Sequence, residues 1–417
     1  MQARASASTI VPAQGEVVAP VVAPPPGNPR FELLDGLRAI AALSVVALHA
    51  DVYTDYFPGW QGAYVRQLAS GVTIFFLLSG FLLYRPFVVA RVTGRNRIRV
   101  RDYARRRLLR IVPAYWLALT ILAIWPGLPG SVLSTDWWRY YGFLQDFRGD
   151  TLFNGLGTAW SLGTEVSFYL LLPLYAMLLD RSAARRSLRT LVGSEIAVLV
   201  VLSLLSLVFR SLVSSSHSNL GYTLLGTFDW FAIGMALAVM SVAVAHAGRP
   251  PRVVRLIELH PSLCWIAAFG ALTVAAAYWE RTGRYDAYSG GPLHLIWGAI
   301  ALFLLLPAVF PGTSHRGVPR RILSTRLLAW LGIISYGIYL WHLPLVPKIA
   351  AAASSILGVK LAGLALTALL FGLVAGTSIA CAATSYYLVE RPLLRFKNGF
   401  QRGGSSAPPA LRAPPKH

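Results

Sequence analysis

The chain has 417 residues, of which 55% are hydrophobic and only 13% are charged, and its mean hydropathy is +0.56. Soluble domains carry about 25% charged residues, so this composition excludes a soluble globular protein and indicates a polytopic helical membrane protein. The net charge of +21 would suit a nucleic-acid partner, but the basic residues lie between apolar runs, where the positive-inside rule accounts for them; we therefore expect no nucleic-acid binding.

The chain begins with a Pro-, Ala- and Val-rich stretch, 1–30, which we expect to be a disordered cytoplasmic tail. A transmembrane domain over 31–397 and a second disordered cytoplasmic tail over 398–417 are expected to follow. Ten apolar runs are long enough to cross a bilayer. They occur at about 35–52, 70–90, 108–126, 160–180, 191–210, 222–245, 261–279, 292–310, 327–347 and 360–388. The predicted fold class is therefore all-α, with about ten transmembrane helices.

The connecting segments predict the orientation of these spans. An even number of spans places both termini on the same side. Most of the 38 lysines and arginines fall in the two tails and in the loops of that side. Because basic loops stay in the cytoplasm, both termini are predicted to be cytoplasmic.

The first span carries three ionisable residues, Asp35, Arg38 and His49. Charged groups inside a membrane helix are costly and are functional candidates. Arg38 and His49 are eleven residues apart, which is close to three helical turns, so they share one face about 16 Å apart along the axis. Asp35 lies one turn before Arg38 and is expected to pair with it. His49 is either an interfacial histidine bonded to a neighbouring helix or a general base or transient acyl carrier.

The second and third spans add two further patterns. Ser79 and Gly80 lie in the middle of the second span, where small residues favour close helix packing or line a narrow passage. The segment 91–110 that enters the third span is rich in arginine. Cytoplasmic topology and contact with anionic headgroups account for it, and binding of a phosphate-rich ligand is compatible with that explanation.

On the outer side, the loop at about 127–158 is rich in aromatic residues and is either an interfacial belt or a lid for an acceptor. Glu165 in the fourth span and His342 in the ninth are predicted at the level of His49, where the three could converge. Glu165 would then orient the histidine or a substrate hydroxyl, or it is a buried carboxylate bonded to another helix. His342 either joins this group or has a structural role. Asp229 in the sixth span needs a partner that the sequence does not assign.

Several other kinds of site are not indicated. Cys264 and Cys381 both lie in apolar runs, so no disulfide or cysteine-ligated metal site is expected. The chain has no metal-binding cluster, P-loop, dinucleotide fingerprint or Gly-x-Ser-x-Gly elbow. We expect no tightly bound cofactor and no metal, and the oligomeric state stays open.

Six segments together resemble the membrane acyltransferase-3 family, which includes O-acetyltransferases of bacterial surface polysaccharides and acylases of macrolides and glycolipids. The resemblance covers roughly 31–397. The segments are LDGLRAIA (34–41) with His49, FFLLSGFL (75–82), RRLLRIVPAY (106–115), WSLGTEVSFY (160–169), SYGIYLWHLP (335–344) and VERP (389–392).

The resemblance implies ten helices, an acyl-CoA donor taken from the cytoplasm, expected to be acetyl-CoA, and transfer to a hydroxyl at the outer face. It places the family's essential histidine at His49 and its paired arginine at Arg38. With the span geometry, it assigns His49 and Glu165 as catalytic. The predicted donor-binding residues are Asp35, Arg38, Arg106, Arg107, Arg110 and Tyr115. The predicted passage or acceptor residues are Ser79, Gly80, Trp160, Tyr336 and His342.

The predicted function is therefore O-acylation of an extracytoplasmic cell-envelope polysaccharide or glycolipid by a multi-pass membrane enzyme in contact with membrane lipid. Some family members carry an additional C-terminal esterase-like domain, which this chain is too short to include, so a second transfer step is expected to need another protein. The alternatives are acylation of a small secreted metabolite, transport of a lipid-linked saccharide, and a non-catalytic scaffold.

Overall fold

The computed structural model describes residues 32–54, 59–94, 98–183, 187–213, 218–247, 250–284, 287–288, 291–311, 317–357 and 363–398. The predicted N-terminal tail, 1–30, lies outside these residues, as does the predicted C-terminal tail apart from Asn398. Part of the arginine-rich segment, 95–97, also lies outside them.

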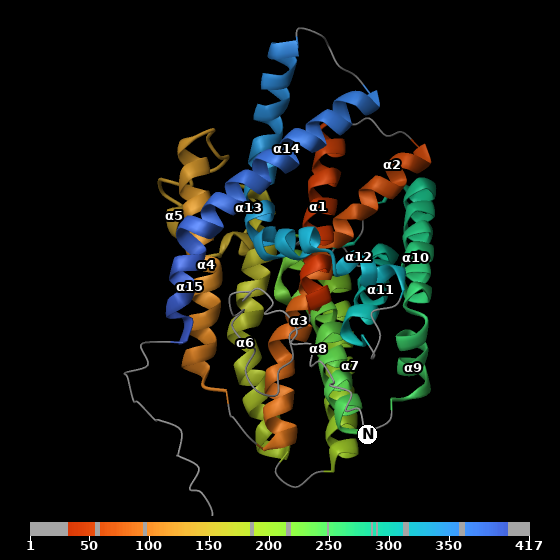
Figure 1. The fold of residues 1–417 in the computed structure, drawn as a ribbon. Helices are drawn as coiled ribbons and strands as arrows, with labels where there is room; N and C mark the ends of the chain where they lie inside the picture. The colour runs from red at the N-terminus through yellow and green to blue at the C-terminus, as the bar shows by residue number, and fades with distance from the viewer. Residues whose placement is uncertain are drawn as a thin grey trace, which may run out of the picture. The chain divides into compact units, whose positions relative to one another are not determined.

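All regular secondary structure in the described residues is helical (Figure 1). Ten helical segments are long and apolar enough to cross a membrane, which confirms the predicted fold class. The long helices are α1 (Glu32–Thr54), α3 (Gly71–Thr93), α4 (Val100–Ile124), α6 (Trp160–Ala183), α7 (Leu188–Val213), α8 (Leu224–Ala247), α10 (Pro261–Thr282), α11 (Pro292–Val309), α13 (Arg326–Leu357) and α14 (Gly363–Ser385).

Shorter helices complete the fold. They are α2 (Gly59–Arg66), α5 (Trp137–Tyr141), α9 (Arg252–Leu259), α12 (Val318–Leu323), a π-helical segment (Tyr386–Glu390) and α15 (Arg391–Leu394), together with single 3₁₀ turns. The aromatic loop before α6 holds α5 and two of these turns, Gln145–Phe147 and Gly157–Ala159. The loop is therefore folded against the helices.

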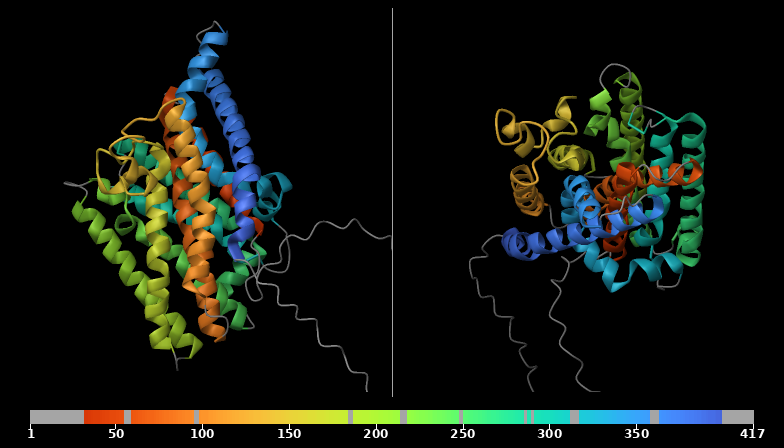
Figure 2. Two further views of the ribbon diagram at one scale, coloured as in Figure 1. Left: turned by 90° about the vertical axis from the view of Figure 1, so that its left-hand side faces the viewer. Right: turned by 90° about the horizontal axis from the view of Figure 1, so that it is seen from above.

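Helix α1 packs along α13, and α3 packs along α8. α14 contacts both α1 and α13 and crosses them obliquely (Figures 1 and 2). Glycines allow these close approaches. A methyl group at Gly332 would overlap the backbone of Asp35 in α1, and one at Gly80 would overlap the carbonyl of Phe231 in α8. The prediction of close packing at Gly80 is therefore confirmed.

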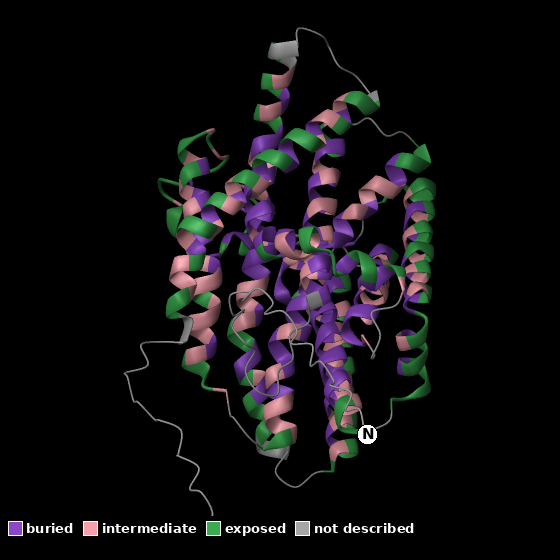
Figure 3. Ribbon diagram, in the orientation of Figure 1, coloured by how far each residue is buried: buried purple, intermediate pink, exposed green. Residues whose placement is uncertain are grey.

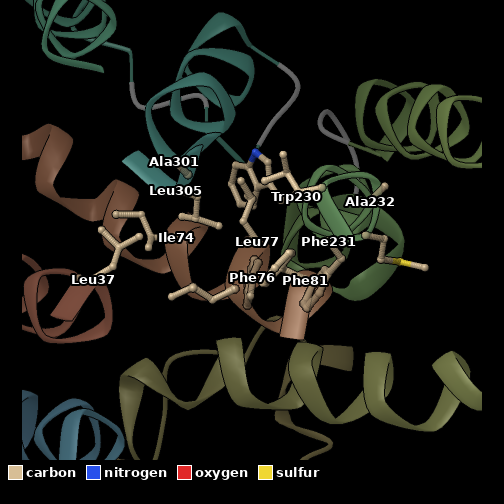
Figure 4. Close-up of a cluster of buried hydrophobic side chains, with 14 of the residues drawn as sticks. Leu37, Ile74, Phe76, Leu77, Phe81, Trp230, Phe231, Ala232, Ala301 and Leu305 are labelled. Atoms are coloured by element: carbon tan, nitrogen blue, oxygen red, sulfur yellow. The ribbon is translucent and has the colours of Figure 1, made fainter. Parts of the chain in front are cut away.

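The largest hydrophobic cluster lies where α1, α3, α8 and α11 meet (Figure 4). Phe76 stacks on Phe231 with ring centroids 4.7 Å apart, and stacked aromatic rings of this kind stabilise a core beyond their buried area. Buried residues concentrate in these central helices (Figure 3). By contrast, α7 exposes a stripe of large apolar side chains, namely Val200, Val201, Leu204, Leu205, Val208 and Leu212, as a lipid-facing helix does.

Candidate functional site

The close packing of α1 and α13 brings His49 and His342 together. His49 Nδ1 and His342 Nε2 are 3.1 Å apart. His49 Nδ1 also lies 2.9 Å from the Val45 carbonyl oxygen, and His342 Nδ1 lies 2.9 Å from the Tyr339 carbonyl oxygen. His342 is fully buried, whereas His49 retains accessible surface. Of the three groups predicted to converge, His49 and His342 are in contact, whereas Glu165 bonds to other residues.

Tyr339 connects the histidine pair to the start of α6. Its ring lies 5.7 Å from that of His342. Its hydroxyl donates to the Thr158 carbonyl at 3.1 Å and lies 2.9 Å from Ser161 Oγ. Trp160, between these two residues, instead packs edge-on against Tyr222 and Tyr288. The acceptor role predicted for Trp160 stays a prediction, and its ring belongs to this buried aromatic group.

Glu165 is paired with residues other than His49. Ser79 Oγ donates to Glu165 Oε1 at 2.5 Å, and the Tyr169 hydroxyl donates to Oε2 at 3.1 Å. The charges of Arg38 and Arg110 also act on this carboxylate. Ser79 and Glu165, predicted separately, are therefore brought together on the side of the arginines. The catalytic role of Glu165 stays a prediction.

Arginines from α1 and α4 gather beside Glu165. Arg38 and Arg110 are close enough to repel each other, while Asp35 and Glu165 attract Arg38. Arg107 is in turn repelled by Arg110 and Arg106. The Nε atoms of Arg38 and Arg107 are buried and have no hydrogen-bond partner among the described residues. We call Arg38, Arg106, Arg107 and Arg110 the arginine cluster. Binding an anion would stabilise such a cluster of like charges.

Two tyrosines predicted near the donor or the passage bind backbone carbonyls. The Tyr115 hydroxyl donates to the Tyr140 carbonyl at 2.8 Å, and its ring stacks on Phe143 at 4.4 Å. Tyr115 therefore holds the aromatic loop against α4. The Tyr336 hydroxyl donates to the Ile111 carbonyl at 3.0 Å and so links α13 to α4. Their predicted functional roles remain untested.

Sequence reasoning missed two residues beside the arginine cluster. Tyr169 follows Glu165 by one helical turn, and its i,i+4 spacing is the signal that could have indicated it. Glu390 lies in the π-helical segment, accepts a hydrogen bond from Ser385 at 3.2 Å, and acts electrostatically on Arg110. π-Helical turns often mark functional sites, but such a turn has no simple sequence signature.

Asp146 in the aromatic loop was also missed. The residue is 1% exposed, and its carboxyl accepts a hydrogen bond from the Thr164 backbone N–H. A methyl group at Gly163 would overlap it. Burial raises the pKa of the Asp146 carboxyl well above its ordinary value, because desolvation disfavours the charged form. Asp146 therefore anchors the loop over the start of α6 through its bond to the Thr164 backbone.

The unassigned Asp229 does have a partner. His294 Nε2 lies 2.7 Å from Asp229 Oδ2, and His294 Nδ1 lies 2.9 Å from the Ala287 carbonyl. Arg210 donates to the same carbonyl. This second buried cluster ties the segment before α11 to α7 and α8. No group of metal ligands occurs among the residues that the structure describes.

Comparison with known proteins gives a consistent result. The model of a family described as an acyltransferase domain, Acyl_transf_3, matches residues 31–386. The peptidoglycan O-acetyltransferase OatA of Listeria monocytogenes serovar 1/2a is 25% identical over 331 residues, covering 75% of this chain and 49% of OatA. YrhL of Bacillus subtilis (strain 168), named as a candidate peptidoglycan O-acetyltransferase, is 30% identical over 337 residues, covering 75% of this chain and 48% of YrhL.

A candidate O-acetyltransferase of Staphylococcus aureus (strain COL) is 24% identical over 328 residues, covering 75% of this chain and 50% of that protein. The chain thus spans about half the length of the curated relatives it matches. No solved structure matches it.

Proposed function

The chain belongs to the Acyl_transf_3 family of acyltransferase domains, and we propose that it is a membrane O-acyltransferase. It moves an acyl group, expected to be acetyl, from cytoplasmic acyl-CoA to a hydroxyl of an extracytoplasmic cell-envelope saccharide. Two similar proteins are named for O-acetylation of peptidoglycan, which supports a saccharide acceptor. A glycolipid or a small secreted metabolite is the alternative acceptor.

The observation that carries this proposal is the arginine cluster. Arg38 and Arg107 present buried Nε–H groups without a partner among the described residues, and their neighbours include other arginines. Carboxylates from Asp35 and Glu165 offset only part of this charge. The phosphates of a CoA nucleotide supply the missing negative charge and accept these hydrogens.

From the positive-inside pattern we expect the arginine cluster toward the cytoplasm and His49 toward the outer side. Arg38 and His49 lie on one face of α1, about 16 Å apart along the axis. The pantetheine arm of the donor runs along this face from the arginines to the histidine. Ser79 and Glu165 lie beside the arginine end and hold the walls of α3 and α6 together through their hydrogen bond.

At the outer end, His49 takes the proton of the acceptor hydroxyl as its oxygen attacks the thioester carbonyl. The C–O bond forms, the C–S bond breaks, and the departing sulfur takes the proton from the histidine. A transient acyl-histidine is the second route. Both routes consume one acyl-CoA and release one CoA thiol for each ester formed.

The test uses the full chain in liposomes with acetyl-CoA and a soluble peptidoglycan fragment. We expect thiol release together with a mass increase of one acetyl group on the fragment. His49→Ala should abolish both, while His246→Ala should not, because His246 lies exposed in α8. Full activity of His49→Ala would refute the mechanism. Movement of a lipid-linked saccharide across the membrane without thiol release would favour a transporter.

A further inference from the structure

The hydrogen bonds of the two histidines determine where their hydrogens lie. A carbonyl oxygen can only accept, so His342 Nδ1, 2.9 Å from the Tyr339 oxygen, carries a hydrogen. His49 Nδ1 carries one for the same reason, since it lies 2.9 Å from the Val45 oxygen. His49 therefore donates in its contact with His342 Nε2, and its single Nδ1 hydrogen is shared between that nitrogen and the Val45 oxygen. His342 Nε2 accepts it, and His342 is neutral.

This arrangement leaves Nε2 of neutral His49 with a free electron pair. The two rings differ in access, because His342 is fully buried and both of its nitrogens are occupied. His49 keeps accessible surface. Only His49 can therefore meet a substrate, and only through Nε2.

The pair also determines what stabilises His49 when it becomes charged. Glu165 Oε1 and Oε2 accept hydrogens from Ser79 and Tyr169. Besides the Val45 carbonyl, the partner of His49 Nδ1–H is an imidazole nitrogen, in the place that a carboxylate occupies in a Ser-His-Asp triad. A hydrogen bond to an ionised group is about twice as strong as a neutral one, so this contact strengthens as His49 takes the proton.

Resting on the proposed function, we propose that His342 is a positioning residue of the acyl transfer. Together with the Val45 carbonyl, it holds the hydrogen of His49 on Nδ1, so that Nε2 takes the proton of the acceptor hydroxyl. As the C–O bond forms and the C–S bond breaks, His49 carries both hydrogens and donates Nδ1–H to His342. The departing sulfur then takes the hydrogen from Nε2, and the pair returns to its starting state.

The first test does not depend on activity. The full chain with ¹⁵N-labelled histidine is studied by NMR above the pH at which its histidines become neutral, and the His49 signals are identified by their loss in His49→Gln. We expect neutral His49 to carry its hydrogen on Nδ1. His246 is the internal comparison, because its Nδ1 also lies 2.9 Å from the i−4 carbonyl of Val242. A hydrogen on Nε2 of neutral His49 would overturn the assignment, even in an active protein.

The second test compares two substitutions of His342 in the liposome assay. His342→Leu removes the acceptor and should lower kcat at least ~100-fold, the scale of a misplaced general base, while KM for acetyl-CoA changes little. His342→Gln keeps an acceptor oxygen and should recover most of the lost kcat. A wild-type kcat in His342→Leu would overturn the positioning role. Failure of the proposed function has a different signature, since then the wild-type protein itself releases no thiol.

Discussion

Replacing Arg107 with alanine tests whether the arginine cluster binds the donor. Arg107 Nε is buried without a hydrogen-bond partner among the described residues, and it faces the like charges of Arg106 and Arg110. Arg107→Ala therefore removes a repulsion within the protein, and we expect the variant to fold. Its cost should appear only when an anionic donor binds.

The size of that cost follows from the chemistry of the lost contact. A hydrogen bond to a charged group contributes about 1.5–3 kcal/mol, which corresponds to a rise in KM of about 10- to 150-fold. We expect kcat to change much less, because the arginine binds the donor equally in the ground state and in the transition state. Arg101→Ala, in the same basic segment but exposed, should leave KM for acetyl-CoA within about 3-fold of wild type, as weak exposed charge contacts do.

The assay measures thiol release at varied concentrations of acetyl-CoA and of acetyl-pantetheine, a donor without phosphates. If Arg107 binds phosphate, its substitution should raise KM for acetyl-CoA and leave KM for acetyl-pantetheine unchanged. The ratio of the two effects isolates the contact between arginine and phosphate, as a double-mutant cycle does. An equal loss with both donors would refute the reasoning, because the substitution would then act on the fold or on the catalytic step.

Two further predictions concern packing and pH. Gly80→Ala should lower the free energy of unfolding by about 1–3 kcal/mol, because the added methyl group would overlap the Phe231 carbonyl. The control Gly193→Ala should leave the free energy of unfolding unchanged, because nothing lies within 4 Å of the added methyl group. Equal melting temperatures of the two variants in detergent would contradict this prediction. Asp146 has a folded-state pKa well above its ordinary 3.8, so its contribution to stability is lost as pH rises above about 4. Asp146→Asn, which stays neutral, should flatten the fall of melting temperature with pH, whereas parallel curves would exclude a titrating Asp146.

The fold was predictable from the sequence because a bilayer restricts the choices. Backbone groups in lipid must be satisfied within a helix, so ten apolar runs become ten spanning helices, as found. The packing order of the helices was not predictable. α1 contacts α13, nearly 300 residues away, through Gly332, and a glycine in an apolar run does not reveal which helix it will meet.

The site was predictable only in part, because the sequence does not determine which helices pack together. The in-register spacing of Arg38 and His49 follows from one helix, so the sequence contains it. The partners of His49 and Glu165 depend on the rotation of neighbouring helices, which hydropathy does not determine. Both His342 and Glu165 were expected to lie beside His49, yet Glu165 pairs with Ser79. The pairing of Asp229 with His294 likewise depends on how α8 and α11 are rotated against each other, so the sequence did not predict it.

The length of α1 between Arg38 and His49 limits the kind of donor that the proposed reaction can use. Gly36 and Gly332 bring α1 against neighbouring backbones so closely that a single methyl group would overlap them. These contacts oppose sliding of α1, and the helical rise sets a distance of about 16 Å between Arg38 and His49 along its axis. A donor must span that distance between its charged group and its acyl carbon. Acyl-CoA does so through a long neutral arm, whereas an acyl phosphate has its acyl group directly beside its charge and would leave His49 out of reach.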